Sequence, residues 1–226
     1  MSTPSTTGDT PGQNPPTASL TERRKAETRM EIARAAAGLF VRQGLRATRA
    51  EDIAQAAGIA PRTFYRYFAT KEEAIAPLYV IGAQRWAEAV RSAPAALSVP
   101  AALEHAVRHT LTPGSGVSAA SWEWVRTLIH LADTSPALRK VWAEVCQSAE
   151  HHLASVLAER TARDGDNVAP TPRLRFAAAV AGAAVRVAME TWAADTAAPT
   201  GEQGPMALAL RNLEALRGFD WQGEGA

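Results

Sequence analysis

The sequence predicts an all-α protein in which an N-terminal three-helix helix-turn-helix domain is joined to a larger C-terminal helical bundle. Three observations predict this fold class. After residue 20, apolar residues recur at helical spacing, strands of alternating apolar and polar residues are not evident, and prolines and glycines separate the helical stretches. The chain has 226 residues, of which 46% are hydrophobic and 21% charged, so it can bury a sizeable core.

Composition and charge divide the chain. Residues 1–20 are nearly all Thr, Ser, Pro, Gly, Asn and Gln, so we expect a disordered leader. Residues 21–70 form the predicted helix-turn-helix domain, and residues 71–226 form the helical body. Residues 21–71 hold 11 Lys and Arg against 5 Asp and Glu, although the whole chain has a net charge of only +1. Such a basic unit is typical of nucleic-acid binding, but a solvated basic face would have the same composition.

Three features of the sequence indicate the cellular compartment of the protein. Its single cysteine, Cys146, excludes an intramolecular disulfide. The longest uncharged apolar run, Phe176 to Val185, is much shorter than the roughly 20 residues that cross a membrane, so no membrane association is expected. The first residues have neither a basic start nor an apolar stretch, which argues against secretion. We therefore expect a cytoplasmic protein.

Glycines mark the ends of the first two predicted helices. The first begins near Thr21 and ends at Gly44, and the second covers Ala50 to Ala57, with Gly58 as its left-handed stop. The apolar face of the first helix consists of Ile32, Ala36, Leu39 and Phe40.

The third helix is predicted to begin near Pro61, since proline is favoured in a first turn, and it carries Phe64 and Phe68 four residues apart. Thr70 and Glu73 have the spacing of a capping box that opens the fourth helix. Further breakers leave helical stretches in the body at residues 71–92, 100–111, 118–133, 136–163, 172–196 and 205–217.

One proline is unusual for its predicted position. Pro77 lies well inside the predicted fourth helix. There it should remove a backbone hydrogen bond to Glu73 and bend the helix where the two domains join.

The segment Ala50–Phe68, AEDIAQAAGIAPRTFYRYF, has the pattern helix, glycine turn, helix. If Phe64 and Phe68 point inward, the outward residues of the second helix are Arg, Thr and Tyr. Arginine can donate two hydrogen bonds to guanine, while threonine and tyrosine can reach phosphates or a thymine methyl group. This pattern favours a DNA-binding helix-turn-helix over the alternative, a basic helical hairpin packed on a core.

Residues 24 to about 71 resemble the DNA-binding module of the TetR family of bacterial transcriptional regulators. The matching segments are IARAAAGLFVRQGLRAT and EDIAQAAGIAPRTFYRYFATKEE. The resemblance implies a homodimer with two DNA-binding domains, and a C-terminal body that binds a small effector and makes the dimer contact. By motif position, it assigns DNA contacts to Thr48, Arg49, Arg62, Thr63, Tyr65, Tyr67 and Lys71.

Two departures from the family pattern concern these contacts. Family members usually have Ser or Thr at the position of Ala60, whereas here Ala60-Pro61 replaces the cap with a preorganised proline. Arg49 also stands where a small hydroxyl residue is more usual. Both changes leave the fold assignment intact and affect the base contacts.

An effector pocket would be built from the aromatic residues of the body. Trp86, Trp122, Trp124, Trp142 and Trp192 lie there, and the predicted head has no tryptophan. Such residues line pockets for apolar or aromatic ligands, although the same spacing is also that of an ordinary core. The candidate pocket residues are Trp86, His109, Trp122, Arg126, His130, Trp142, Cys146 and Met189.

A surface of small residues on the helix near 172–196 faces an apolar last helix. In the family that the chain resembles, these two helices form the four-helix bundle of the dimer; the alternative is core within one chain. The predicted interface consists of Ala178, Ala181, Gly182, Val185, Met206, Leu210 and Leu213.

No cofactor, metal or catalytic motif is predicted. His105 and His109 have a spacing that can hold zinc, but the sequence has neither a cysteine cluster nor HExxH, nor a Walker A motif or nucleophile elbow. We therefore expect a regulator that is not an enzyme: a repressor released from a palindromic operator in double-stranded DNA by an effector. The alternatives are a DNA-binding regulator that senses a partner protein, and a helical metal sensor or enzyme with a basic docking domain.

Overall fold

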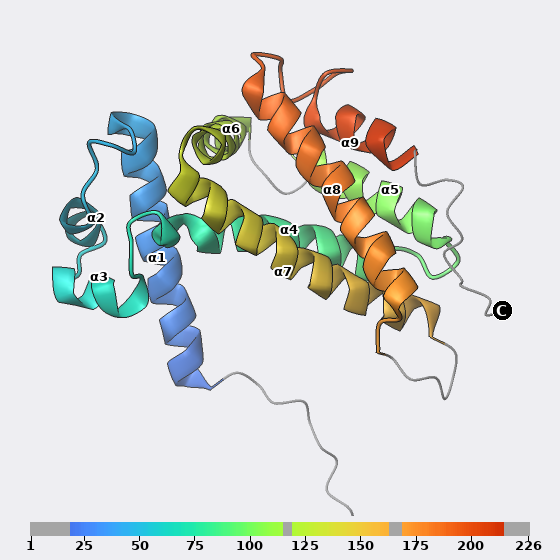
Figure 1. Ribbon diagram of the computed structural model, residues 1–226, viewed down its shortest axis with the longest axis horizontal. Coiled ribbons are helices and arrows are strands. Elements are labelled where there is room, and N and C mark those ends of the chain that lie inside the picture. The colour runs from blue at the N-terminus through green and yellow to red at the C-terminus, as the bar shows by residue number, and fades with distance from the viewer. Residues whose placement is uncertain (1–18, 115–118, 163–168, 215–226) are drawn as a thin grey trace, which may run out of the picture.

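The computed structural model describes residues 19–114, 119–162 and 169–214, and each regular element in these ranges is helical (Figure 1). The elements are α1 (Leu20–Gln43), α2 (Ala50–Ala56), α3 (Pro61–Tyr67), the short 3-10 helix η1 (Glu73–Ile75), α4 (Ala76–Ser92), α5 (Val99–Leu111), α6 (Ala119–Thr134), α7 (Pro136–Thr161), α8 (Pro172–Ala194) and α9 (Pro205–Glu214). We call α1–α3 the head and α4–α9 the body.

The head lies at one end of the molecule (Figure 1). There α2 packs against both α1 and α3, while α1 also contacts α4 and α6. In the body, α7 packs between α4 and α8, and α5 and α9 pack against each other on the side away from the head.

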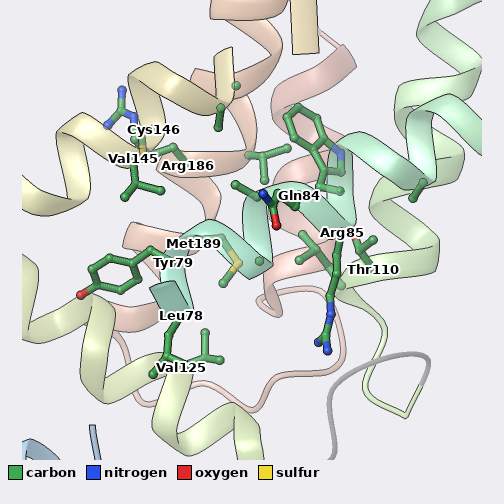
Figure 2. Close-up of a pocket in the computed structure, with 18 of the residues that line it drawn as sticks. Leu78, Tyr79, Gln84, Arg85, Thr110, Val125, Val145, Cys146, Arg186 and Met189 are labelled. Carbon is green, nitrogen blue, oxygen red and sulfur yellow. The ribbon is translucent and has the colours of Figure 1, made fainter. Parts of the chain in front are cut away.

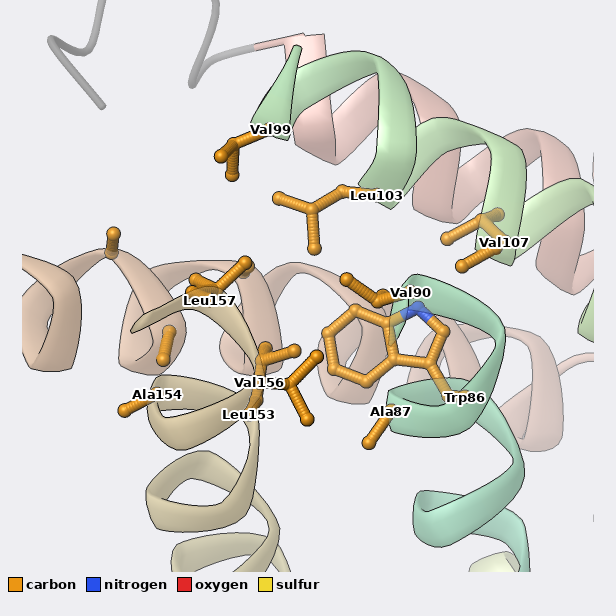
Figure 3. Close-up of a cluster of buried hydrophobic side chains, with 14 of the residues drawn as sticks. Trp86, Ala87, Val90, Val99, Leu103, Val107, Leu153, Ala154, Val156 and Leu157 are labelled. Carbon is orange, nitrogen blue, oxygen red and sulfur yellow. The ribbon is translucent and has the colours of Figure 1, made fainter. Parts of the chain in front are cut away.

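One apolar core lies wholly within the body (Figure 3). It joins Trp86 and Val90 of α4 to Leu103 of α5 and to Leu153 and Leu157 of α7. Alanines of α8 complete it, because their small side chains let that helix approach α7 and α9 closely.

A second core crosses the predicted domain boundary at residue 70. Phe40, Ile53 and Phe64 of the head belong to the same buried cluster as Tyr79 of α4 and Leu128 of α6. The head is therefore packed directly on the helices that begin the body, and a movement of α4 or α6 must disturb contacts with α1.

The predicted helices form, with one correction at Pro77. The predicted fourth helix begins with η1, and α4 starts only at Ala76, so Pro77 lies in its first turn. A first-turn proline loses no intrahelical hydrogen bond, and the expected bend is absent for this reason. The capping interaction is made ahead of η1, where the Glu73 N–H donates to Thr70 Oγ1 at 3.2 Å.

The ends of the chain differ slightly from the prediction. Ser19 caps α1 and Leu20 is its first residue, so the predicted leader is too long by these positions. Residues 1–18 and 215–217 lie outside the described residues. Among the helices described, α8 alone has the length and hydropathy that a membrane span needs, and in this fold it packs against α6, α7 and α9.

Candidate DNA-binding interface and effector cavity

The turn between α2 and α3 has the geometry that the sequence predicts. Gly58 has a φ of +68°, a conformation that glycine adopts without the steric penalty of a Cβ. The Ile59 N–H then donates to the Ala54 carbonyl at 2.9 Å and closes the turn. Pro61 begins α3, and Phe64 and Phe68 are buried, as expected from the pattern.

The outward face of α3 and the start of α2 form one polar surface. Arg62 is exposed in the first turn of α3. Tyr65, with 51% of its surface exposed, donates from its hydroxyl to Glu51 Oε1 at 3.4 Å. The Arg49 Nε lies 3.5 Å from the same carboxylate, and its side chain is 76% exposed. Such exposed contacts are weak, so phosphate oxygens can compete for both donors.

Two further predicted DNA-contact residues, Thr63 and Tyr67, are half-buried. The Tyr67 ring lies under the Arg66 guanidinium, 5.4 Å from the ring centroid, and its carbonyl accepts from Arg29 at 3.0 Å. The hydrogen bond from Arg29 fixes the end of α3 on α1. The DNA contacts of Arg49, Arg62, Thr63, Tyr65 and Tyr67 stay predictions.

Thr48 requires a correction, because its side chain is fully buried. Its hydroxyl donates to the Gly44 carbonyl at 2.8 Å and accepts from Gln43 Nε2 at 3.3 Å. The predicted DNA contact through this side chain is wrong. Thr48 instead closes the turn after α1, because a buried hydroxyl must find partners inside the protein.

The Lys71 side chain also makes hydrogen bonds to the backbone of the head. Its Nζ donates to the carbonyl oxygens of Leu45 and Thr48, each at 2.7 Å. Two of its three N–H groups are thereby committed to the loop between α1 and α2. Lys71 thereby ties the segment after α3 to that loop, while its DNA contact stays a prediction.

The body contains a cavity of about 870 Å³, lined by α4, α5, α6, α7 and α8 (Figure 2). A volume of this size suits a drug-sized ligand. Most of its wall is apolar or aromatic, including Tyr79, Val125 and Met189. Six of the eight predicted pocket residues line it, namely Trp86, His109, Trp122, Trp142, Cys146 and Met189.

The other two predictions are wrong for this cavity. Arg126 lies over the Trp192 ring, 4.4 Å from its centroid, and donates to the Ala197 carbonyl. His130 is exposed and lines a separate, smaller cavity of about 500 Å³. The cause is the helical period of α6, which turns Val125 and Ile129 toward the main cavity and the following residue of each away from it.

The indole N–H groups of the cavity wall differ in their partners. Trp142 Nε1 donates to Glu190 Oε1 at 2.7 Å. Trp86 Nε1 and Trp122 Nε1 are buried and have no acceptor among the described residues. Leaving a buried donor unpaired costs about 1–3 kcal/mol, so such groups are typical of sites whose partner comes from outside the chain.

A polar bridge separates the main cavity from the smaller one. Arg186 NH1 pairs with Glu190 Oε2 at 3.1 Å, so Glu190 joins Arg186 of α8 to Trp142 of α7. Cys146 lies on the same wall, and burial raises the pKa of its thiol to about 12, an effect that the nearby Arg186 charge partly opposes. Cys146 is therefore a neutral thiol at physiological pH.

Tyr79 lies on the cavity wall and also belongs to the buried cluster that includes Phe40 and Phe64 of the head. Burial raises the pKa of this phenol, and its hydroxyl donates to the Leu128 carbonyl of α6 at 2.7 Å. The Tyr79 ring also meets the Trp142 ring edge-on, with 4.9 Å between centroids. Tyr79 is not among the predicted pocket residues, since an isolated tyrosine in an apolar helix has the same pattern as core.

A second connection runs through α6 and was also missed. A Cβ built on Gly38 of α1 would lie 3.5 Å from the Trp124 ring, so α6 rests on α1 at a position without a side chain. Trp124 faces the head from the same helix that presents Val125 and Ile129 to the cavity. The only sequence signal was an extra tryptophan next to the predicted cavity face.

Comparisons with known proteins agree with this arrangement. Residues 32–75 match the model of the tetR family of bacterial regulatory proteins, and residues 97–215 match the MftR C-terminal domain. The chain is 32% identical over 219 residues to the HTH-type transcriptional regulator TcmR of Streptomyces glaucescens, which covers 92% of each chain. The chain belongs to the TetR family of bacterial transcriptional regulators. It is thus a DNA-binding transcriptional regulator, and its homologues are regulators and not enzymes.

Solved structures of other regulators share the fold. FadR of Thermus thermophilus, a repressor solved with lauroyl-CoA, is 24% identical with a TM-score of 0.51, and the match covers 83% of this chain and 92% of FadR. The fatty acid degradation regulator FadR of Bacillus halodurans is 20% identical with a TM-score of 0.54, covering 85% of this chain and 95% of the other. At these identities the likeness concerns the fold alone.

The predicted dimer residues of this TetR-family chain face its own core. Ala178, Ala181 and Leu213 are buried within one chain, so they cannot form the surface between two chains. Val185, Met206 and Leu210 pack partly against the same core. The small residues of α8 therefore do pack against the apolar face of α9, but they do so within one chain.

Gly182 likewise faces the inside of the chain. A Cβ at this position would lie 2.9 Å from Glu150 Cγ of α7. A glycine in the middle of a helix costs about 1 kcal/mol relative to alanine. The residue is thus explained by the Glu150 side chain that lies across it, and the predicted dimer contact at Gly182 is wrong.

Proposed function

We propose that this TetR-family regulator is a cytoplasmic homodimeric repressor that leaves a palindromic operator when a small apolar or aromatic effector fills the body cavity. One observation carries the proposal. The helices that line the cavity, α4, α6 and α7, also supply residues to the buried cluster that holds the head together. Filling the cavity therefore acts on the same helices that set the orientation of the head.

The two heads of a dimer read successive major grooves only when they are about 34–36 Å apart. A small rotation of α1 on α4 and α6 changes this spacing. An effector shifts the equilibrium only by its difference in affinity between the DNA-binding conformation and the alternative one. The Tyr79 hydrogen bond to Leu128 joins α4 to α6, two cavity helices that both contact α1, and Trp124 of α6 lies against Gly38 of α1.

The dimer surface that we propose is the outward face of α8. Phe176 and Val187 are 59% and 44% exposed, unusual values for large apolar side chains. They are separated by 11 residues, which places them on one face of the helix. Val187→Glu should shift the protein toward monomer in sedimentation, whereas Ser148→Glu, at an exposed position of α7, should not; equal dimerisation of the wild type and Val187→Glu would exclude this surface.

The function is tested by selecting bound fragments from random double-stranded DNA with the full chain. We expect a palindromic site bound by a dimer, with an affinity that falls steeply as salt rises. The selected site then serves as the probe in a screen of apolar aromatic compounds. Compounds that quench tryptophan emission should also release the site. Quenching without release would contradict control by an effector, and recovery of no preferred sequence would contradict operator binding.

A further inference from the structure

Glu150 presents to the body cavity a carboxylate that no residue described by the structure pairs with. Its side chain is half-buried and lines both the main and the smaller cavity. Among the residues that the structure describes, no hydrogen bond or ion pair reaches it. A charge in such a place is normally paired, because burial without a partner disfavours the charged form.

The neighbouring cation is already occupied. Arg186 lines the same wall, but its NH1 group contacts both carboxylate oxygens of Glu190, at 3.3 Å and 3.1 Å. Cys146, one turn before Glu150, is held as a neutral thiol, because burial raises its pKa to about 12. Two carboxylates and one guanidinium thus meet at this wall, which leaves an excess of one negative charge.

The backbone of α8 makes room for this carboxylate. The missing Cβ of Gly182 would lie 2.9 Å from Glu150 Cγ and 3.6 Å from its Oε1. Any other residue at position 182 would push the carboxyl group away from where it lies. The glycine is the second, independent sign that the position of Glu150 matters, since its own conformation is helical and needs no glycine.

The aromatic wall supplies the rest of the chemistry. Trp142, Cys146 and Glu150 lie on successive turns of α7, so Trp142 and Glu150 face the same cavity. Aromatic ring faces attract cations, and a carboxylate pairs with an ammonium group. Arg85 lines the cavity too, but Figure 2 shows it on the side opposite Cys146 and Arg186.

We infer that the effector carries a protonated amine on an apolar body, with the ammonium group at Glu150 and the body against the aromatic wall. This rests on the proposed function and adds the chemical class of the ligand. A ligand of this class neutralises the Glu150 carboxylate, which receives no hydrogen bond or ion pair from the residues that the structure describes. An anionic ligand of the same shape meets an excess of negative charge at this wall.

Three matched probes test the inference on the full-length protein at pH 7. They are anthracene with an aminomethyl, a hydroxymethyl or a carboxylate group on its central ring, and binding is read from quenching of tryptophan emission. We expect the amine to bind about tenfold more tightly than the alcohol, which corresponds to about 1.4 kcal/mol, and the carboxylate to bind most weakly. The ratio of amine to alcohol affinity is the decisive quantity, because a change in cavity shape affects both probes.

Two variants and one control locate the effect. Glu150→Gln keeps the shape and removes the charge, so the amine should fall to within about twofold of the alcohol. Gly182→Ala should reduce the ratio as well, by displacing the carboxylate. Glu144→Gln, on the same helix but paired with Lys140 at 3.8 Å and exposed, should leave the ratio unchanged.

The inference is overturned if the amine does not bind, if it binds no better than the alcohol, if the carboxylate binds best, or if Glu150→Gln keeps the preference. Release of the operator is measured separately with the same probes. If the amine is preferred through Glu150 but no bound probe releases DNA, the proposed repressor function fails while the ligand class stands. If the alcohol releases DNA as well as the amine does at equal occupancy, the function stands independently of the charge.

Discussion

The head and the body differ in how completely they satisfy their own buried polar groups. In the head, the Thr48 hydroxyl donates to the turn after α1, and Arg29 donates to the Tyr67 carbonyl. Lys71 donates to two carbonyls of the loop between α1 and α2. In the body, Trp86 Nε1, Trp122 Nε1 and Arg126 Nε are buried without an acceptor among the described residues. The buried polar groups named for the head thus have partners within the chain, whereas the body contains unpaired donors and a cavity.

This difference fits the two tasks. DNA recognition needs a rigid helix at a fixed position, and complete packing with paired polar groups provides it. Ligand recognition needs a cavity and unpaired groups, each of which lowers the stability of the free protein. Since one buried cluster joins the head to α4, α6 and α7, a ligand in the body cavity can change the position of the head.

The largest expected effect comes from truncating the filled core of the head. Phe64→Ala should cost about 3–5 kcal/mol of unfolding free energy, because the buried ring leaves a void. Met189→Ala, at the wall of the existing cavity, should cost about 2 kcal/mol, since it only enlarges a space already present. Urea unfolding at fixed protein concentration measures both. Equal costs would remove the contrast between a filled head and an open body.

Lys71→Met should cost about 2–3 kcal/mol, because two carbonyls that accept charged hydrogen bonds lose their donor while the methylene stem stays. Lys140→Met is the control, since this exposed lysine pairs with Glu144 at the surface, and it should change stability by less than about 0.5 kcal/mol. The measurement is urea unfolding together with DNA binding across a salt series. A stable Lys71→Met protein whose salt slope falls by about one unit would instead restore the role of a free phosphate contact.

Arg62→Ala should weaken binding to the selected operator by about 1–3 kcal/mol and relax the preference at one base pair in each half-site. Arg62 is exposed in the first turn of α3, and the structure gives it no role in packing. Unfolding should therefore be unchanged, in contrast to Lys71→Met. The measurement is binding to single-base variants of the site. An unaltered base preference would show that Arg62 does not read a base.

The smallest expected effect concerns the unpaired indoles. Trp122→Phe removes an N–H without a partner, so the lost apolar area is partly offset, and stability should change by less than about 1 kcal/mol. The buried Trp192 packs edge-on against it but donates to the Ala197 carbonyl at 3.1 Å, so Trp192→Phe should cost about 1 kcal/mol more. Thermal or urea unfolding of the pair measures the difference. A larger loss for Trp122→Phe would indicate that this N–H already has a partner.

Local patterns predicted most of the fold. Gly58, Pro61, Phe64 and Phe68 act within a few residues of themselves, so the turn and α3 follow from the sequence. The helical period of α6 likewise places Trp122, Val125 and Ile129 on one face, and all three line the cavity. Pro77 was misplaced because the sequence does not show where a 3-10 turn ends and an α-helix begins.

The sequence by itself determined the all-helical fold, the helix-turn-helix and the family, because these depend on neighbours in the chain and on motifs of fixed spacing. Tertiary structure decided which residue each side chain meets. Lys71 donates to a loop 23 to 26 residues before it, and Gly182 of α8 lies against Glu150 of α7. An amphipathic pattern shows that a face is covered, but the covering element, whether core, cavity or second chain, is set by contacts between helices far apart in the sequence.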